Sequence, residues 1–166
     1  MKRIAPILAF IILLAAFGYW WYSPTQVLKR RTDSLLRTLT MDLGKGTAAR
    51  QMGVYSFNSL LAEDVELNSP SITDANGVFA RSEMESAYSW LCEKAKQTRF
   101  QRVKLDSITT EGNTGVVKFT LLALVELPNS RPADGIYQTT FHWQKTESAW
   151  LLTRADWSEV APKSQN

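Results

Sequence analysis

The chain begins with an apolar run that no charged residue interrupts. The nineteen residues 4–22 carry no charge and end in the aromatic cluster Tyr19-Trp20-Trp21-Tyr22. A helix rises about 1.5 Å per residue, so a run of this length just crosses a hydrocarbon core of about 30 Å. Aromatic rings with a polar edge prefer the headgroup level. The pattern therefore predicts one N-terminal transmembrane helix within residues 1–22, contacting the membrane through residues 4–22.

A cleaved signal peptide is the alternative interpretation of this run. Met1-Lys2-Arg3 is a basic start, and small residues near Ala16 would suit a cut at Gly18. The run continues past Gly18 through four aromatic residues, however, whereas the apolar part of a signal peptide usually has about 7–15 residues. We therefore expect an uncleaved anchor. Basic residues nearly balance on its two flanks, and the short basic tail favours a cytoplasmic N-terminus with the domain outside.

Two segments with the apolar spacing of a helix follow the predicted anchor. Ser23 can cap a helix and Pro24 suits its first position, so the first helix is predicted to run from there to Gly44. A second helical pattern covers about residues 47–62, with a break at Gly53. The basic residues at 29–31 are either a solvated face of the first helix or a contact with anionic lipid.

A short strand and a third helix follow. Val65–Asn68 has strand character, Pro70 stops it, and residues 74–77 read as a turn. Ser82 and Glu85 have the spacing of a capping box, which predicts a helix beginning there. Its apolar face is formed by residues four or three apart: Met84, Tyr88, Leu91 and Ala95.

After Lys96 the apolar period changes from that of a helix to two, the period of a strand. Strands are predicted around residues 103–108, 116–125, 136–145 and 150–157. Short connections between most of them predict an antiparallel meander packed by the preceding helices, an α+β fold. The domain is expected to cover residues 23–160, followed by a short polar tail, 161–166.

Composition narrows the function classes. The formal net charge of +3 includes Lys2 and Arg3, and without them 17 basic residues face 16 acidic ones, a balance of +1. Nucleic-acid binding calls for a concentrated basic patch, so it is not expected. Cys92 is the single cysteine and His142 the single histidine, which excludes an intrachain disulfide and any cysteine or multi-histidine metal cluster. We expect no metal and no cofactor, and Cys92 to be a small buried hydrophobe.

The order of elements resembles the nuclear transport factor 2-like superfamily (NTF2-like, SnoaL-like). The resemblance is carried by residues 60–67, where a helix leads into a short strand, and by the last hairpin, with Trp143 on one strand and residues 150–154 on the next. It covers about residues 24–160 and implies a cone in which three N-terminal helices close a curved antiparallel sheet around a cavity. Members of the family include isomerases, dehydratases, hydrolases and non-catalytic binding or assembly domains, so the fold does not imply a function.

The catalytic residues of the ketosteroid isomerase-like branch do not carry over. Its general-base aspartate, directly before a proline, corresponds here to Ser69 before Pro70. Its second acid falls near Thr139, and the tyrosine of its first helix falls among leucines, around residues 35–39. A hydroxyl with an ordinary high pKa is a poor general base near neutral pH. We therefore predict no catalytic residue and favour a protein that is not an enzyme.

Candidate ligand-binding residues are those expected to line the cavity, with ordinary core packing as the alternative for the aromatic ones. They are Tyr55, Tyr88, Tyr137, Thr139, Phe141 and Trp143. Arg154 is placed near the rim, where it would meet either a carboxylate ligand or an ion-pair partner. The adjacent Glu63 and Asp64 are expected at a solvated helix end.

His142 should point to the outer face of the sheet, because its parity is opposite to that of Phe141 and Trp143. Asp156 on the neighbouring strand is its expected partner. An interface role is predicted for His142, Trp150 and Trp157 on this outer face, through which a homodimer is possible.

Three functional hypotheses follow. The first is a membrane-tethered, non-catalytic domain for protein interaction or assembly in the cell envelope, with an envelope protein as partner. The second is a small-molecule-binding or enzymatic cone of the isomerase or dehydratase type. The third is a secretion-system assembly subunit, although the Asn-Pro turn of that class is not evident and residues 128–130 have the reverse order, Pro-Asn. The expected location is a bacterial-type inner membrane, crossed once, with the domain on the periplasmic or another extracytoplasmic side.

Overall fold

The computed structural model describes residues 13–14, 17–44, 46–69 and 76–160. Residues 17–21 are helical. The helices and strands that follow are α2 (Pro24–Leu39), α3 (Thr47–Gln51), α4 (Gly53–Asn58), β1 (Leu61–Asn68), β2 (Gly77–Ala80), α5 (Arg81–Lys94), β3 (Gln97–Glu111), β4 (Thr114–Glu126), β5 (Ala133–Lys145) and β6 (Trp150–Glu159).

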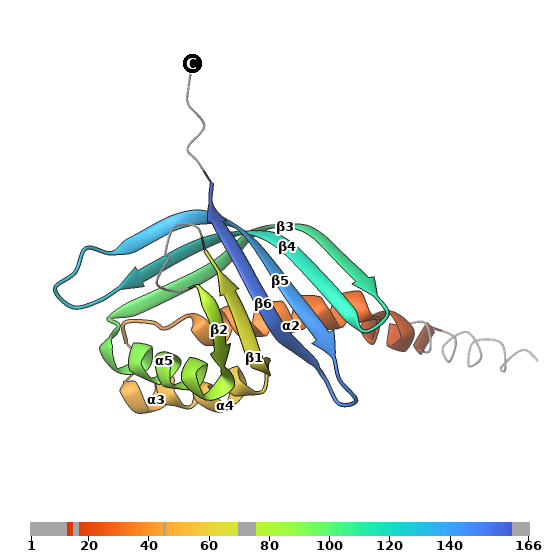
Figure 1. Cartoon of the computed structure of the whole chain (residues 1–166), viewed down its shortest axis with the longest axis horizontal. Helices are drawn as coiled ribbons and strands as arrows, with labels where there is room; N and C mark the ends of the chain where they lie inside the picture. The colour runs from red at the N-terminus through yellow and green to blue at the C-terminus, as the bar shows by residue number, and fades with distance from the viewer. Residues whose placement is uncertain (1–12, 15–16, 45, 70–75, 161–166) are drawn as a thin grey trace, which may run out of the picture.

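The strands form one curved sheet in the order β2-β1-β6-β5-β4-β3 (Figure 1). Strands β3 to β6 make the predicted antiparallel meander. Strand β1 joins the sheet parallel to β6, and β2 pairs antiparallel with β1. Helix α2 runs along one face of the meander, while α3, α4 and α5 gather below β1 and β2 (Figure 1). This is the expected α+β architecture of helices on a bent sheet.

Helix α2 begins where the sequence predicts and ends earlier. Pro24 occupies its first turn, and its buried face is made by Leu28, Thr32, Leu35 and Leu36. The helix stops at Leu39 instead of continuing to Gly44, because Met41 forms an isolated bridge with Thr98 of β3. The backbone of Met41 both donates to and accepts from Thr98. A long-range hydrogen-bonded pair thus replaces the last predicted helical turn.

The second helical pattern breaks at Gly53, as predicted, into α3 and α4. A side chain at Gly53 would collide with the hydroxyl of Tyr88, so the close approach of α4 and α5 requires glycine there. The predicted extension of this helix to residue 62 is wrong. Leu61 and Ala62 already belong to β1, because Leu61 pairs with Leu152 of β6.

Two further local predictions near β1 need correction. Glu63 and Asp64 are exposed, but they lie in a strand and not at a helix end. The cap of α5 also lies before the predicted Ser82–Glu85 box. Glu83 Oε2 accepts a hydrogen bond of 2.7 Å from the Ala80 N–H, because pairing of β2 with β1 brings the helix start forward to Arg81.

Burial along β4 shows how the core is graded. Val117 and Phe119 are fully buried, Leu121 nearly so, and Ala123 and Val125 only in part. These five residues share the apolar face that the sequence predicts, directed towards the helices. The core is therefore densely packed at one end of the sheet and opens towards the β4–β5 connection.

Within the described residues, no helix combines the length and apolarity needed to cross a bilayer. Most of the predicted anchor, residues 1–12 and 15–16, and the predicted polar tail lie outside the described residues.

Leu28 provides a test of the packing of α2 on the sheet. Its fully buried side chain lies over Gly115 of β4 and beside Trp150. We expect Leu28→Ala to lower the free energy of unfolding by about 2–5 kcal/mol, since a large buried side chain is lost and a cavity is left. Equilibrium urea denaturation measures the change. Leu43→Ala, at a residue that is 67% exposed, is the control and should shift the free energy by less than about 0.5 kcal/mol. Equal effects of the two substitutions would contradict this packing.

Candidate functional site

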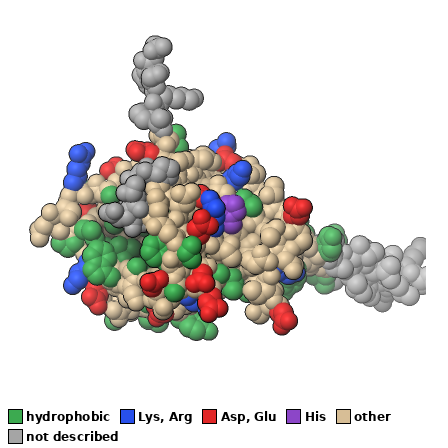
Figure 2. All heavy atoms as spheres, viewed as in Figure 1, with side chains coloured by type: hydrophobic (Ala, Val, Ile, Leu, Met, Phe, Trp, Pro, Cys, Tyr) green, Lys and Arg blue, Asp and Glu red, His purple; other side chains and the backbone are tan. Residues whose placement is uncertain are grey.

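A cavity of about 330 Å³ lies between the helices and the concave face of the sheet. On the helix side, its wall contains Leu35, Leu36 and Leu39 of α2, Phe57 of α4 and Met84 of α5. On the sheet side, it contains Leu121, Ala123, Tyr137, Thr139, Phe141 and Trp157, among others. Hydrophobic side chains also gather on the lower left of the face drawn in Figure 2, where α5 and the β4–β5 end of the sheet lie.

The cavity lining carries almost no polar chemistry. Among the residues that line it in the described chain, none is Asp, Glu, His, Lys, Arg or Cys. Thr139 is 1% exposed, and its hydroxyl has no hydrogen-bond partner within the described protein. The half-buried Tyr137 adds a second hydroxyl-bearing side chain. The site can therefore accept an apolar molecule and form a hydrogen bond to it, and its described lining supplies no carboxylate or imidazole.

An aromatic stack closes the inner end of this cavity. The rings of Phe119 and Phe141 meet edge to face at a centroid distance of 5.0 Å, and those of Phe141 and Trp143 at 6.3 Å. Edge-to-face contacts of this kind stabilise aromatic cores beyond the area that they bury. Phe141 forms part of the cavity wall, and Phe119 and Trp143 lie behind it in the core.

A separate polar cluster lies on the outer face of the sheet. His142 Nε2 is 3.0 Å from Asp156 Oδ2, and Arg154 Nη2 is 2.7 Å from Asp156 Oδ1. Asn68 Nδ2 donates to the same carboxylate at 3.2 Å, and Arg154 also pairs with Glu66 at 3.4 Å. Pairing of β1 with β6 sets Glu66 opposite Arg154 and Asn68 opposite Asp156. Figure 2 shows the histidine beside acidic and basic side chains.

These contacts stabilise the charged form of Asp156. Its partial burial raises the pKa of the carboxyl, but hydrogen bonds from Arg154 and Asn68 and the nearby positive charges lower it by more, so the net shift is downward. The hydrogen bond to Asp156 and the negative charge of that carboxylate raise the pKa of the Arg154 guanidinium. Both oxygens of Asp156 are engaged by neighbours, which makes this cluster a link between β1, β5 and β6.

Comparison with solved structures identifies the architecture. An NTF2-like superfamily protein from Salmonella enterica matches with a TM-score of 0.63 and 13% identity, over 84% of this chain and 93% of that one. An NTF2-like protein from Cytophaga hutchinsonii matches with a TM-score of 0.60 and 16% identity, over 83% and 99%. The domain has the NTF2-like fold. A ketosteroid isomerase-like protein from Erwinia carotovora also matches, with a TM-score of 0.59 and 13% identity, over 85% and 99%.

At these identities the likeness concerns the fold alone. The sequence matches no protein-family model and no curated protein. What this NTF2-like cone does must therefore be argued from its own side chains.

Of the residues predicted to line the cone, Tyr137, Thr139 and Phe141 lie in the cavity wall. Trp143 does not, because it is buried in the core behind Phe141. Tyr55 is 84% exposed on the outside of α4, so its placement in the wall is corrected. Phe57, and not Tyr55, is on the buried face of α4.

Tyr88 is buried but lies behind the cavity wall. Its ring stacks on Phe57 at a centroid distance of 4.7 Å, and its hydroxyl donates to the Thr38 carbonyl at 3.0 Å. Burial, with the neighbouring Cys92 as a lesser cause, raises the pKa of Tyr88 above its ordinary range. Burial also raises the pKa of the Cys92 thiol. Tyr88 and Cys92 therefore belong to the packing between α4, α5 and α2.

The two tryptophans predicted on the outer face point inward. Trp150 is buried in the core and Trp157 lines the cavity. The reason is a bulge between β5 and β6, where His142 pairs with Arg154 but Trp143 pairs with Leu152. The extra residue, Thr153, reverses the parity of β6, so residues 150 and 152 and then 155 and 157 face inward. His142 remains on the outer face, and the homodimer through it stays a prediction.

The residues that the resemblance aligned with catalytic groups of the isomerase-like branch carry no acid. Ser69 is fully buried at the end of β1, but it is not among the residues that line the cavity. Thr139 and the leucines at positions 35, 36 and 39 of α2 lie in the wall. Arg154, expected near the rim, pairs with Asp156 and Glu66 outside the cone. The sequence analysis did not predict Phe57, Met84 and Phe100 as wall residues. The only signal for them was their place on the apolar face of a helix or strand.

The outer cluster leads to a pH-dependence test. Because the pKa of Asp156 is lower in the folded protein than in the unfolded chain, its charge stabilises the fold above the unfolded pKa, about 3.9. That contribution disappears as the pH falls through the folded value. We expect Asp156→Asn to be less stable than the unsubstituted protein at pH 7, with the difference narrowing below about pH 4. Thermal unfolding from pH 7 to pH 3 measures it.

Asp134→Asn is the control, since Asp134 is an exposed aspartate of β5 without a hydrogen bond or ion pair within the described chain. A difference between Asp156→Asn and the unsubstituted protein that stays constant down to pH 3 would show that the Asp156 charge does not stabilise the fold.

Proposed function

We propose that this NTF2-like domain binds a compact, mainly apolar small molecule in its cone and performs no acid–base chemistry there. The observation that carries the proposal is the cavity of about 330 Å³, whose described lining is apolar except for Thr139 and Tyr137. Small-molecule sites in proteins typically measure about 300–1,000 Å³ and combine apolar walls with a few polar groups. The volume suits a ligand at the small end of that range.

The Thr139 hydroxyl supports a ligand with one hydrogen-bonding group. A buried polar group without a partner costs about 1–3 kcal/mol, which a ligand's hydroxyl or carbonyl would recover. The leucines of α2 and the rings of Phe141 and Trp157 would enclose the rest of such a ligand. A ring or short chain with a single polar substituent fits this arrangement.

The absence of acids from the described lining argues against the chemistry of isomerases and dehydratases. General acid–base catalysis needs a titratable group within about 2.6–3.2 Å of the proton that moves, or one water away. His142 and Asp156 are such groups, but they lie on the opposite face of the sheet from the cavity. The ketosteroid isomerase-like neighbour therefore supports the shape of the cone and not a shared reaction.

A substitution that fills the cavity tests the proposal. We expect Ala123→Phe to weaken binding of an environment-sensitive apolar dye at least about tenfold, because the new ring would occupy volume that the ligand needs. Leu122→Phe is the matched control, since residue 122 has the opposite parity on β4 and does not line the cavity. Fluorescence titration gives the dissociation constants.

Native mass spectrometry of the untreated protein completes this test. A co-purifying small molecule that is present with Leu122→Phe and missing with Ala123→Phe would support the proposal. Dye binding that is equal in the two variants would refute it. Thr139→Val then reports on polarity, because a lost hydrogen bond to the ligand would weaken binding by about 3–10-fold, whereas a wholly apolar ligand would bind at least as well.

We propose further that residues 4–22 tether the domain to a bacterial-type inner membrane, with the domain on the extracytoplasmic side. The support is the uncharged run in the sequence and the exposure of Tyr19, Trp20, Trp21 and Tyr22. The full chain should stay with the membrane fraction in an alkaline carbonate wash, and its release would refute the tether. Envelope-protein interaction and a secretion-system role stay predictions beside it.

A further inference from the structure

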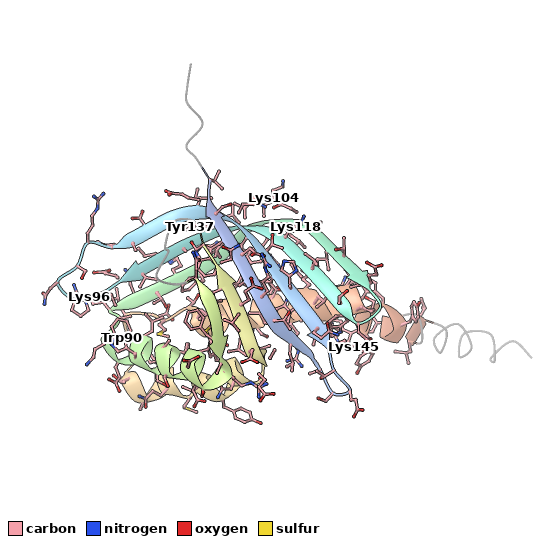
Figure 3. All side chains as sticks on the ribbon, viewed as in Figure 1. Trp90, Lys96, Lys104, Lys118, Tyr137 and Lys145 are labelled. Carbon is pink, nitrogen blue, oxygen red and sulfur yellow. The ribbon has the colours of Figure 1, made fainter. Side chains whose placement is uncertain are left out.

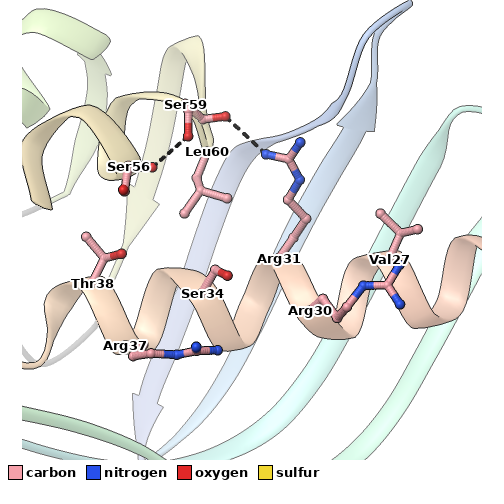
Figure 4. A pocket seen from close by; sticks show the side chains of 9 residues that line it. All are labelled: Val27, Arg30, Arg31, Ser34, Arg37, Thr38, Ser56, Ser59 and Leu60. Atoms are coloured by element: carbon pink, nitrogen blue, oxygen red, sulfur yellow. Dashed lines mark hydrogen bonds between the residues drawn. The ribbon is translucent and has the colours of Figure 1, made fainter. Parts of the chain in front are cut away.

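A basic groove runs along the outer side of α2, away from the ligand cavity. Its walls carry three guanidinium groups, from Arg30, Arg31 and Arg37, together with the hydroxyls of Ser34, Thr38, Ser56 and Ser59 (Figure 4). The groove measures about 440 Å³. No carboxylate is among the described residues that line it. Guanidinium groups and hydroxyls all donate hydrogen bonds to phosphate oxygens.

The three arginines lack a carboxylate partner within the described residues. Arg30 Nη2 donates to the Trp21 carbonyl at 2.9 Å, and Arg31 Nη1 donates to the Ser59 carbonyl at 3.1 Å. Arg37 is exposed in the last turn of α2. The nearest acidic residue along the helix, Asp33, is engaged on another side by Arg102 at 2.8 Å. Within the described residues, no carboxylate neutralises their positive charge.

Exposed aromatic rings lie just before this groove. Trp20 is 51% and Trp21 43% exposed, and Phe17 stacks on Trp21 at a centroid distance of 5.7 Å. The Arg30 guanidinium lies 4.5 Å from the centre of the Trp21 ring, a cation–π contact that connects the aromatic cluster to the groove. From Pro24 to Arg37 the rise of α2 covers about 20 Å, and the aromatic cluster precedes it. Aromatic and basic groups thus extend together along one stretch of the molecule.

We propose that this groove and the aromatic cluster form a docking surface for the headgroups of anionic phospholipids. Unpaired arginines match phosphate in charge and in hydrogen-bond geometry, and amphipathic rings prefer the headgroup level. The docked domain lies with α2 along the membrane, instead of standing away from it on a tether. The proposal concerns the orientation of the domain, so it stands or falls separately from the cavity and from the insertion of residues 4–22.

The test measures how close the groove comes to the headgroups. In the full chain, a fluorophore is attached at Ser56→Cys, on the groove wall. The native Cys92 is buried and stays unlabelled. The labelled protein is mixed with vesicles that contain a lipid with a nitroxide headgroup, which quenches the fluorophore at short distance. A second sample carries the fluorophore at Lys118→Cys, on the far side of the sheet (Figure 3). Vesicles of phosphatidylcholine alone are compared with equal mixtures of phosphatidylcholine and phosphatidylglycerol.

In anionic vesicles, quenching at position 56 should exceed that at position 118 by at least about tenfold. Each arginine near an anionic surface raises the equilibrium constant for docking by about fivefold, so three of them keep most of the domain docked with position 56 near the headgroups. The excess should vanish in phosphatidylcholine vesicles and in 0.5 M salt, which screens charges beyond about 4–5 Å. Arg30→Gln/Arg31→Gln/Arg37→Gln should lose it. The charge-matched Lys94→Gln/Lys96→Gln/Lys104→Gln, at exposed lysines outside the groove, should keep it.

Equal quenching at the two positions, no quenching, or an excess that does not depend on the anionic lipid would overturn the proposal. The salt and lipid comparisons use the unsubstituted groove, so they decide the matter even where the triple arginine variant folds poorly. A chain that is released by carbonate yet shows the anionic-lipid excess would refute the tether and support the docking surface.

Discussion

The edge-to-face stack of Phe119, Phe141 and Trp143 is the packing interaction on which the inner architecture depends. It occupies the concave face beside Gly115, which pairs with Trp143 and lies under Leu28 of α2. Beyond the stack, towards the β4–β5 connection, the same face carries smaller side chains such as Ala123 and Thr139. Large rings fill the space between sheet and helices at one end, and the smaller side chains leave a cavity at the other.

The bulge opposite His142 and Trp143 divides the chemistry of β6 between the two faces of the sheet. It turns Trp150 and Trp157 inward and leaves Arg154 and Asp156 outside, where they join His142. The ionic cluster therefore links three strands and contributes nothing to the cavity. Among the described residues, the cavity thus has mainly apolar walls, and the titratable groups of β5 and β6 lie on the other face of the sheet.

Helix α2 carries two different surfaces at once. Leu35, Leu36 and Leu39 face the cavity, while Arg30 and Arg31 lie on the outer groove. The helix is therefore the physical connection between the proposed ligand site and the proposed membrane contact. An apolar ligand that partitions into lipid would be concentrated near a domain docked in this way, which makes the two proposals compatible on physical grounds.

Local periodicity was sufficient for much of the fold. Pro24 marked the start of α2, Gly53 marked the break between α3 and α4, and alternation along β4 identified its inward face, because each of these depends on neighbours in sequence. Tertiary structure decided what depends on distant partners. Leu61 becomes a strand residue only by pairing with Leu152, and α2 ends only because Met41 meets Thr98. Trp157 enters the cavity only through the bulge opposite His142. A single-residue shift in register reverses which face a side chain occupies, and no local pattern records it.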